Sequence, residues 1–431
     1  DSSIRSQVLF MLSRFPAVCR IIAVVTLCPF TLEASELSEH DWPWWRGPDR
    51  NGISHSDQNP PLAWSDTENI AWKTSVPGKG HGSVIVVGDR ILLATADHES
   101  EEQLVLCLNR SNGKEIWRAV VHKDGFATEG NRRSSLASAT PACDGDRVFI
   151  NFLNDGAVYT TALQLDSGKQ LWQTKISDYV IHQGYGSSPA VYNDLVIVTA
   201  DNKSGGAAAA LNAVTGDVVW ERKRPVKPNY PSPIILNVAG RDQLFLIGCD
   251  LVTSLDPTSG RELWEIEAAT TECVTSTVTD GVHVFTSGGY PDNHMSAVMA
   301  DGSGVVAWRN KIRVYVPSML IQDGNLFAVL DSGIATCRVA ATGEELWKSR
   351  LSGTFASSPV IVRDRIYATN DDGTTFVFGA SAEKFELLAK NKLGDNVYAT
   401  PVICNSCIYT RVAHDIDGNR QEFLYCISRS E

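Results

Sequence analysis

The sequence lacks a concentrated run of basic residues. Its densest lysine and arginine clusters are Arg132-Arg133 and residues 222–224, and its 38 basic residues are outnumbered by 50 acidic ones, for a formal net charge of -12. A nucleic-acid-binding surface must concentrate positive charge to release the counterions of the phosphate backbone. We therefore expect no nucleic-acid partner.

Common catalytic motifs are also missing. The sequence contains no Gly-x-Ser-x-Gly, no Walker-type phosphate-binding loop and no His-Glu-x-x-His, so it carries no motif of the common hydrolases or nucleotide-binding enzymes. No set of histidines and acidic residues has the sequence spacing of metal ligands. We predict no metal site.

The apolar run near the N-terminus is too short to cross a bilayer. It spans residues 21–32, which is about half of the ~20 residues that a membrane-spanning helix needs, and it follows Arg14 and Arg20. This order predicts a signal peptide at residues 1–35, with Met11 as a candidate start and the preceding residues as an upstream extension. We expect a periplasmic or secreted protein with no transmembrane span in its mature form.

The ten cysteines have no spacing that dictates their pairing, although export permits disulfides. Cys28 follows Leu27, where a lipoprotein signal has a small residue, so we expect no lipid anchor. Cys404 and Cys407 bracket a two-residue turn between apolar strands, without the βαβ context of a thioredoxin-like site. They are predicted to be a structural thiol pair or a local disulfide.

Internal repetition is the strongest feature of the sequence. A Gly-x-x-x-Trp motif ends at six tryptophans: Trp117, Trp172, Trp220, Trp264, Trp308 and Trp347. Each copy follows an apolar stretch, and the tryptophans recur at intervals of about 40 to 55 residues, which is the length of a four-stranded propeller blade.

A second motif falls between the tryptophans. It consists of a short Ser/Thr/Pro stretch, an apolar run, an Asn/Asp/Gly turn and another apolar run, which is the pattern of two antiparallel strands joined by a tight turn. Eight copies begin at or near Gly82, Ala139, Ser187, Ser232, Thr275, Pro317, Ser357 and Thr400.

These two motifs predict twisted antiparallel sheets that stack around a central axis. The sheet faces are too apolar to remain in water, and a tryptophan on the outer strand supplies a large rigid surface that can wedge against the next blade. The residues expected in this role are the six above and Trp72. Their glycines are expected to permit the tight turn before the outer strand.

The two ends of the chain are expected to complete one blade. The last repeat, residues 398–427, lacks a terminal Gly-x-x-x-Trp, whereas Trp72 lies on a strand with no partners before it. Joining them closes the ring without a free sheet edge. The predicted fold is all-β, an eight-bladed β-propeller of four-stranded antiparallel blades at residues 69–431, after a leader at residues 36–68. A count of seven stays open, because Leu387-Leu388 stands where the seventh repeat should have tryptophan.

The repeats resemble those of the quinoprotein, or PQQ-like, β-propeller family from Trp72 to the C-terminus. The segment Asp41-Trp42-Pro43-Trp44-Trp45-Arg46-Gly47-Pro48, followed by Asn51-Gly52-Ile53-Ser54, is similar to the leader of exported bacterial members with no assigned activity. The family includes quinone-dependent alcohol and glucose dehydrogenases as well as the lipoprotein BamB, which scaffolds the assembly of outer-membrane proteins. The resemblance implies the fold and leaves the function open.

The residues typical of the dehydrogenases are not matched. Those enzymes cover their quinone with a disulfide between adjacent cysteines and hold calcium with Glu, Asn and Asp beside an Asp general base, whereas this sequence has no Cys-Cys dipeptide. Its Asp and Asn residues, as in Asn370-Asp371-Asp372-Gly373, are explained by turns. We expect neither PQQ nor calcium. The similarity to BamB is one of repeat, without its leader or a lipoprotein signal.

In a propeller, the loops that lead from the outer strand of one blade to the inner strand of the next approach the channel mouth. The residues just before each Ser/Thr/Pro stretch lie in these loops. They are the predicted ligand- or partner-binding residues: His81, Arg132, Arg133, His182, Tyr185, Tyr230, Glu272, Tyr315, Phe355 and Tyr398. Aromatic faces with a few polar groups suit the recognition of a sugar or a peptide.

The same residues also have purely structural interpretations. His81 and His182 could be loop histidines with satisfied hydrogen bonds, and the tyrosines could simply fill the channel. Glu272-Cys273 could supply a general acid or a nucleophile. Because the sequence identifies no base partner, a structural cysteine near Cys249 is favoured.

The sequence favours an exported, monomeric binding or scaffold propeller, without catalytic residues, whose partner is an envelope protein or a glycan. The alternative is an enzyme that uses the central funnel, either a quinone-dependent dehydrogenase or a carbohydrate-active enzyme. Whether the chain catalyses any reaction stays open at this stage.

Overall fold

The strands of the structure are the short apolar runs that lie between turns. The computed structural model describes residues 37–127, 130–131 and 133–429, and within them it contains strands and no helix. A helix with the length and apolarity to cross a membrane is accordingly absent from this described part of the chain. The predicted signal peptide at residues 1–35 and the predicted site residue Arg132 lie outside the described residues.

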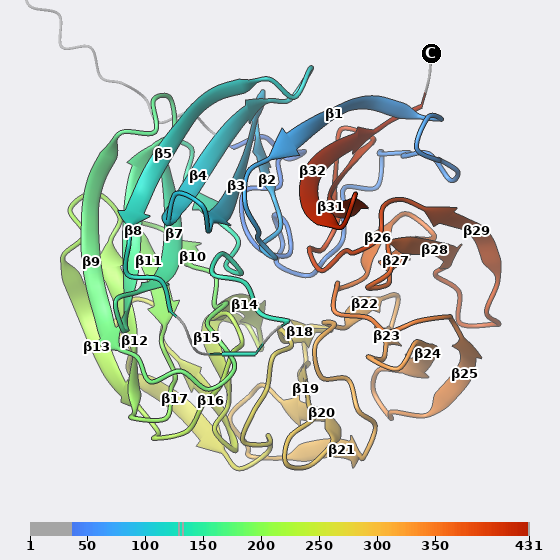
Figure 1. The fold of residues 1–431 in the computed structure, drawn as a ribbon. Helices are drawn as coiled ribbons and strands as arrows, with labels where there is room; N and C mark the ends of the chain where they lie inside the picture. Colours follow the sequence, from blue (N-terminus) through green and yellow to red (C-terminus); the bar gives the residue numbers. More distant parts are fainter. Residues whose placement is uncertain (1–36, 128–129, 132, 430–431) are drawn as a thin grey trace, which may run out of the picture. The chain divides into compact units, whose positions relative to one another are not determined.

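The strands form eight four-stranded antiparallel sheets, which are the blades of a propeller (Figure 1). Blade 1 consists of β2 (Ile85–Val87), β3 (Arg90–Asp97), β4 (Glu102–Asn109) and β5 (Glu115–Lys123), and blade 2 of β6 (Ala142–Cys143), β7 (Arg147–Asn154), β8 (Ala157–Gln164) and β9 (Gln170–Asp178). Blade 3 consists of β10 (Ala190–Tyr192), β11 (Leu195–Thr199), β12 (Gly206–Asn212) and β13 (Val218–Arg224), and blade 4 of β14 (Ile234–Val238), β15 (Arg241–Gly248), β16 (Leu251–Leu255) and β17 (Glu262–Ile266).

Blades 5 to 8 follow in the same way. Blade 5 consists of β18 (Val278–Thr279), β19 (His283–Gly288), β20 (His294–Met299) and β21 (Val306–Asn310), and blade 6 of β22 (Leu320–Gln322), β23 (Asn325–Val329), β24 (Ile334–Val339) and β25 (Glu345–Arg350). Blade 7 consists of β26 (Val360–Val362), β27 (Arg365–Thr369), β28 (Thr374–Gly379) and β29 (Leu387–Lys392). Blade 8 consists of β30 (Val402–Cys404), β31 (Cys407–Ile416), β32 (Asn419–Ile427) and β1 (Ile70–Val76).

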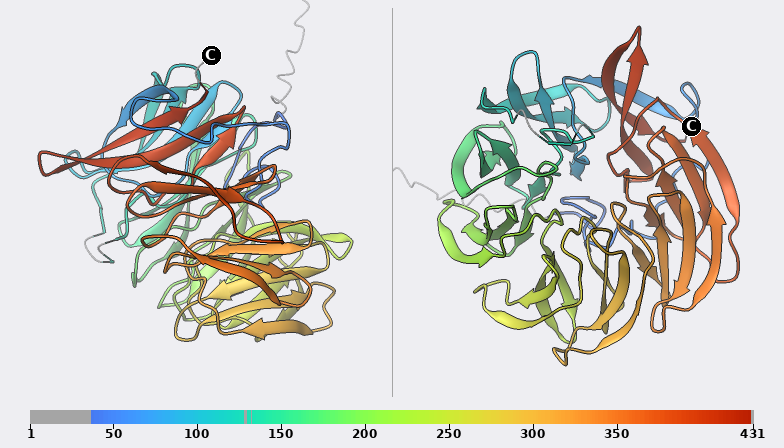
Figure 2. Two further views of the ribbon diagram at one scale, coloured as in Figure 1. Left: turned by 90° about the vertical axis from the view of Figure 1, so that its right-hand side faces the viewer. Right: turned by 60° about the horizontal axis from the view of Figure 1, so that its bottom comes forward.

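The blades follow one another in chain order around a central axis (Figure 2). In each blade the first strand lies nearest the axis and contacts the first strand of a neighbouring blade, as β10 contacts β6 and β14. Inner and middle strands such as β7 are buried along almost their whole length, whereas outer strands such as β9 are exposed or half-buried apart from their tryptophan. The predicted all-β, eight-bladed fold is confirmed.

The ring closes by pairing the two ends of the propeller. β1 runs antiparallel to β32, with Thr74 opposite Leu424, and becomes the outer strand of the blade formed by β30, β31 and β32. The seventh blade is complete although its outer strand, β29, has Leu387 and Leu388 where the others have tryptophan. The count of eight is therefore correct, and the count of seven is excluded.

The Ser/Thr positions of the second motif join adjacent blades near the axis. The backbone N–H of one blade donates to the hydroxyl at the equivalent position of the next blade, at 2.9–3.0 Å, and all of these residues except the half-buried Ser232 are buried. The pairs, donor first, are Ser83 and Thr140, Thr140 and Ser188, Ser188 and Ser232, Ser276 and Ser318, Ser318 and Ser358, and Ser358 and Thr400. The hydroxyls thus satisfy buried N–H groups, whose loss of a partner would be costly.

The tryptophans of the first motif lie against the glycines of the following blade. The indole of Trp117 covers Gly168, where an added Cβ would lie only 2.5 Å from the ring, and its Nε1 donates to the carbonyl of Leu165 at 2.9 Å. The same packing joins Trp72 to Gly113, Trp172 to Gly216, Trp220 to Gly260 and Trp308 to Gly343. The glycine therefore provides room for a neighbouring indole as well as a turn, a second role that the sequence motif did not indicate.

Two tryptophans depart from this arrangement. The Nε1 of Trp264 donates to the side chain of Gln243 in its own blade, and the ring lies against Gly302 instead of the motif glycine. Trp347 donates to the carbonyl of Ser381 at 2.8 Å, in a blade that has no Gly-x-x-x-Trp. Both indoles are nevertheless more than nine-tenths buried, as expected for side chains between blades.

The leader contacts several blades. Trp42 forms a bridge with blade 1 and Ile53 forms one with blade 7. Between them, the fully buried Arg46 donates to backbone carbonyls just before the inner strands of blades 6 and 7, at 2.5 and 3.3 Å. Trp45 donates to the hydroxyl of Ser276 in blade 5 at 2.8 Å. These contacts fasten the leader to the ring and bring Trp45 to its centre.

The cysteines of the described residues are all free thiols. Cys404 and Cys407 lie opposite each other across the predicted turn, as a thiol pair. Burial raises the pKa of the Cys404 thiol to about 12, so it stays protonated at neutral pH. This thiol donates to the backbone carbonyl of His40, and it thereby contributes to the attachment of the leader.

Replacing Gly168 by alanine is expected to destabilise the protein more than replacing Gly156. Both residues have φ of +69°, but a Cβ at Gly156 would meet nothing within 4 Å, whereas one at Gly168 would meet the Trp117 indole. Both variants lose about 1–2 kcal/mol to the left-handed backbone, and overpacking costs Gly168→Ala roughly 1–3 kcal/mol more. Urea unfolding followed by near-ultraviolet circular dichroism measures the difference, and equal losses would contradict the packing role.

Candidate functional site

A cavity of about 760 Å³ lies at the centre of the ring and receives residues from all eight blades. It is called the funnel below. All of the predicted site residues that the structure describes line it: His81, Arg133, His182, Tyr185, Tyr230, Glu272, Tyr315, Phe355 and Tyr398. The structure thus brings together residues that are as much as 317 positions apart in the sequence (398 minus 81).

Propeller topology explains why these residues converge. Each lies in a loop that leads from the outer strand of one blade to the inner strand of the next, such as Tyr230 between β13 and β14 or Tyr315 between β21 and β22. Because the inner strands surround the axis, their preceding loops meet at one mouth of the channel. The positions follow from strand order alone, whereas the contacts among the side chains follow from the structure.

Glu272 is the centre of a buried polar cluster on one side of the funnel. Its Oε1 lies 3.1 Å from Nε2 of His182, and its Oε2 accepts a hydrogen bond from the Tyr315 hydroxyl at 3.4 Å. Only 4% of Glu272 is exposed. Burial, and then the nearby Glu272 carboxylate, raise the pKa of Tyr315, so its phenol remains protonated and can donate.

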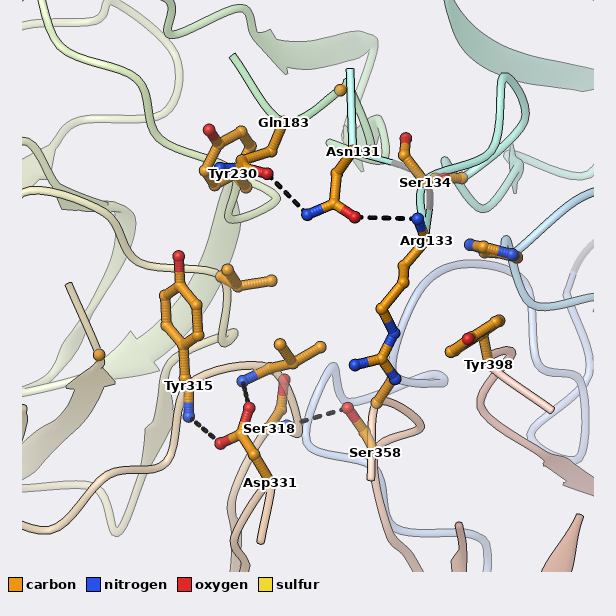
Figure 3. A pocket seen from close by; sticks show the side chains of 18 of the residues that line it. Asn131, Arg133, Ser134, Gln183, Tyr230, Tyr315, Ser318, Asp331, Ser358 and Tyr398 are labelled. Atoms are coloured by element: carbon orange, nitrogen blue, oxygen red, sulfur yellow. Dashed lines mark hydrogen bonds between the residues drawn. The ribbon is translucent and has the colours of Figure 1, made fainter. Parts of the chain in front are cut away.

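Arg133 and Asp371 form an ion pair on the opposite side. The Arg133 guanidinium also lies 5.5 Å from the centre of the Tyr398 ring, and Oδ2 of Asp371 accepts a hydrogen bond from Thr354 at 2.7 Å. Figure 3 shows Arg133 extending across the cavity toward Ser358 and Tyr398. An arginine held on an aromatic face presents its remaining N–H groups to the cavity in a defined direction.

Three buried polar atoms of the funnel have no hydrogen-bond partner of normal geometry within the described residues. They are Nε2 of His81, Oδ1 of Asp371 and the hydroxyl of Tyr230, which lies near the Gln183 backbone. A buried polar atom without a partner costs free energy, which a ligand group or a water can recover. These atoms are therefore candidate contacts for a bound molecule.

His81 is held in its neutral form. Burial lowers its pKa well below 6.5, and the nearby cations Lys79 and Arg420 lower it further. The ring lies 4.4 Å from that of Tyr398, centre to centre. A neutral imidazole offers one donor and one acceptor, so His81 can contact a hydroxyl or amide group of a ligand in either direction.

Several lining residues were not among those predicted from the sequence. Asp331 lies in the turn between β23 and β24 and accepts the backbone N–H groups of Tyr315 and Val316 at 2.8 and 3.2 Å, as Figure 3 shows. Asp371 lies in the equivalent turn of the next blade, between β27 and β28. The turn role that the sequence assigned to Asp371 was incomplete, because its carboxylate also faces the funnel. Repeated Asp-containing turns between the second and third strands are the signal that could have found both.

Other missed residues come from the leader and from loops already considered. Trp45 of the leader lines the funnel, although its motif was interpreted only as a family resemblance. Asn131 donates to the side-chain oxygen of Gln183 at 2.8 Å and accepts the backbone N–H of Arg133, and so joins two loops of the rim. Arg313 lies 4.7 Å from the centre of the Tyr315 ring.

Cys273 is a structural residue in its surroundings. It is fully buried, its thiol lies 3.7 Å from the carbonyl of Thr270, and burial raises its pKa to about 12. The neighbouring Cys249 is also buried, and burial likewise raises its pKa. A thiol with so high a pKa is a poor nucleophile at neutral pH.

The carboxylates of the funnel each have their own partners. Glu272 is engaged by His182 and Tyr315, Asp371 by Arg133 and Thr354, and Asp331 by backbone N–H groups, so each has separate partners. Within the described residues, three or more groups of His, Cys, Asp or Glu converge only at His40, His55 and Asp57, which are in the leader and do not line the funnel. The carboxylates of the funnel therefore do not converge on one point in the described residues.

The fold and its central funnel define an eight-bladed propeller protein built from PQQ-like repeats. A family model described as outer membrane protein assembly factor BamB matches residues 101–339 and 292–383. The chain belongs to this family.

Individual relatives include enzymes and an assembly factor. The chain is 27% identical to a polyvinylalcohol dehydrogenase of Pseudomonas sp, over 66% of this chain and 43% of that protein. It is 23% identical to the outer membrane protein assembly factor BamB of Moranella endobia, over 69% of this chain and 76% of that protein. The chain spans about two fifths of the length of the polyvinylalcohol dehydrogenases that it matches.

Solved structures of both kinds share the fold. BamB from Moraxella catarrhalis matches with a TM-score of 0.56 and 14% identity, over 82% of this chain and 97% of that one. The quinohemoprotein alcohol dehydrogenase of Comamonas testosteroni matches with a TM-score of 0.65 and 12% identity, over 91% of this chain and 81% of that one. At such identities the likeness is one of fold and does not select between binding and catalysis.

The imidazole of His81 is expected to remain neutral down to a pH well below 6.5, since burial and nearby cations oppose its protonation. Proton–carbon NMR across pH 8 to 5 measures this, with His81→Gln identifying the resonance. Because unfolded His81 takes up its proton near pH 6.5 and folded His81 does not, stability falls as the pH drops below that value. The loss of stability at low pH should be smaller in His81→Gln than in the unaltered chain. A His81 pKa at or above 6.5 would contradict the neutral form.

Proposed function

We propose that this chain is a non-catalytic binding or scaffold protein of the cell envelope whose funnel receives a segment of a protein or a glycan. The proposal is supported by the description of the family, outer membrane protein assembly factor BamB, and by the lining of the funnel. Export of the chain is part of the proposal and rests on the sequence of residues 1–35.

The observation that carries the proposal is the combination of aromatic faces with unpartnered polar atoms around one cavity. Tyr230, Tyr315, Phe355, Tyr398 and Trp45 supply apolar surface. The free atoms of His81, Asp371 and Tyr230 supply hydrogen-bonding capacity next to it. A sugar ring or an extended peptide presents this same mixture of apolar surface and polar edge.

The Arg133–Asp371 ion pair of the funnel favours binding over catalysis. Asp371 is engaged by Arg133 and by the Thr354 hydroxyl, so its charge is compensated, and Glu272 accepts a hydrogen bond from Tyr315. Such groups orient a ligand, and they are less available as a general base or as metal ligands. We propose accordingly that the chain functions without PQQ or calcium.

The second candidate is an enzyme that uses the same cavity. It is favoured by the contact between His182 and Glu272, since a carboxylate can orient a histidine for proton transfer. The names of the polyvinylalcohol dehydrogenase relatives also favour it. A dehydrogenase would need an oxidant bound in the funnel, and a carbohydrate-active enzyme would need an acid and a base on opposite sides of a substrate bond.

Isothermal titration with maltohexaose, cellohexaose and chitohexaose, and with a set of unstructured hexapeptides, tests the binding proposal. At least one probe class should bind at one molecule per chain. Tyr315→Ala should weaken that binding by about 1–2 kcal/mol, or roughly 5- to 30-fold, since it removes an aromatic anchor. Tyr192→Ala, which changes a tyrosine outside the funnel that bonds to Asp242, is the matched control. Equal affinity in both variants would contradict a site in the funnel.

Dye-coupled oxidation assays with added PQQ and Ca²⁺ separate the two candidates. The binding proposal predicts no stoichiometric uptake of PQQ and no dye reduction with alcohols, sugars or polyvinyl alcohol as substrates. Uptake of one PQQ per chain with substrate-dependent dye reduction would establish the enzyme instead. Loss of that activity in Glu272→Gln would then assign the reaction to the funnel.

A further inference from the structure

A cluster of imidazoles and carboxylates lies in the leader, away from the funnel. His40, His55 and Asp57 each offer a ligand atom, and these atoms lie within 4.8 Å of one another. Nε2 of His40 is 3.4 Å from Asp57, and Nδ1 of His55 is 2.8 Å from the same carboxylate. Glu39 approaches both rings, at 3.7 Å from His40 and 3.9 Å from His55. His40, His55 and Asp57 therefore converge on one point, and Glu39 lies beside them.

The ring holds the first half of this cluster. The carbonyl of His40 accepts the Cys404 thiol of blade 8, and the adjacent Asp41 accepts the backbone N–H of Gly88 in blade 1 at 2.9 Å. Trp42 then pairs with blade 1. The backbone at Glu39 and His40 is thus anchored to two blades.

The ring holds the second half by separate bonds. Ser54 donates its backbone N–H to Ile361 of blade 7 at 2.8 Å and its hydroxyl to Ile403 of blade 8 at 2.9 Å. Arg363 donates to the backbone carbonyls of residues 56 and 57 at 2.8 and 2.7 Å. The propeller therefore positions His55 and Asp57 opposite His40 before any ion is present, which is the preorganisation that a metal site requires.

Two imidazoles with two carboxylates are a ligand set that suits zinc. Zn²⁺ accepts nitrogen and oxygen ligands at about 2.0–2.2 Å in a tetrahedron, so its ligand atoms lie about 3.3 Å apart. The observed separations range from 2.8 to 3.9 Å around this value, and the side chains are partly exposed, so small rotations can close the site. Mg²⁺ and Ca²⁺ favour all-oxygen sites, which distinguishes them from Zn²⁺ here.

We propose that Glu39, His40, His55 and Asp57 form a zinc-binding site that links the parts of the leader before and after Trp45. His40 lies beside blades 1 and 8 and Asp57 beside blade 7, so the ion would link the leader across the region where the ring closes. The leader between them carries Trp45 into the funnel. Zinc would therefore stabilise the closure of the ring and hold the funnel lining in place.

The absence of a metal motif in the sequence does not oppose this site. His40 and His55 are 15 positions apart (55 minus 40), in a leader without helix or hairpin, so no regular spacing relates their side chains. The alternative is a purely ionic cluster in which the imidazoles pair with the carboxylates, and such exposed pairs contribute little to stability.

Titration of the EDTA-treated, dialysed full chain with ZnCl₂ tests the proposal. We expect saturation at one ion per chain in calorimetry and a rise in Tm of about 2 °C or more at saturating zinc, with no response to MgCl₂. Loss of a residue that only orients a metal ligand weakens metal binding roughly 10–100-fold. His40→Ala and His55→Ala each remove a ligand, so each should weaken zinc binding by more than this. His55 is partly exposed, so its variant is expected to fold normally in circular dichroism.

His98→Ala is the matched control, since His98 is exposed and its ring contacts Phe126 rather than a carboxylate. Its zinc affinity should equal that of the unaltered chain. No calorimetric response and no change in Tm with zinc would overturn the proposal in favour of an ionic cluster. Zinc binding that persists equally in both His40→Ala and His55→Ala would also overturn it, by placing the ion elsewhere.

Discussion

Each blade of this propeller is stable only because its neighbour covers it. The sheet faces are apolar, and five outer-strand indoles lie against the motif glycines of the following blade. Near the axis, Ser and Thr hydroxyls satisfy buried N–H groups of the preceding blade. Because both contacts point the same way around the ring, the structure is complete only when the last blade meets the first, which is the task of β1.

This closure explains how a rigid ring can carry a variable site. The inter-blade contacts use the strands and their first residues, whereas the funnel is lined by the loops before those strands and by turns such as that of Asp331. The lining residues can therefore change without loss of the fold. That separation is consistent with a family whose members include an assembly factor and whose fold is shared with quinohemoprotein dehydrogenases.

Much of the site could be predicted because, in a propeller, the order of the strands along the sequence fixes which loops lie at the channel mouth. A residue such as Tyr230, two positions before Ser232 of its blade, must lie at the channel mouth once strand order is known. Asp371 was misjudged because a turn aspartate has a sufficient local explanation, and only packing shows that its carboxylate also reaches Arg133. Trp45 was missed because no local pattern relates the leader to the axis.

By itself, the sequence determined the type of the blades, the closure of the ring and the loops that face the axis, and it left the count at eight or seven. These features depend on local periodicity and on a repeated motif, and both can be read along the chain. Only the tertiary structure decided which charges pair across the funnel, where the leader runs and how His40 meets His55 and Asp57. Those contacts join residues without a regular spacing, and the side-chain packing that creates them exists only once the ring has formed.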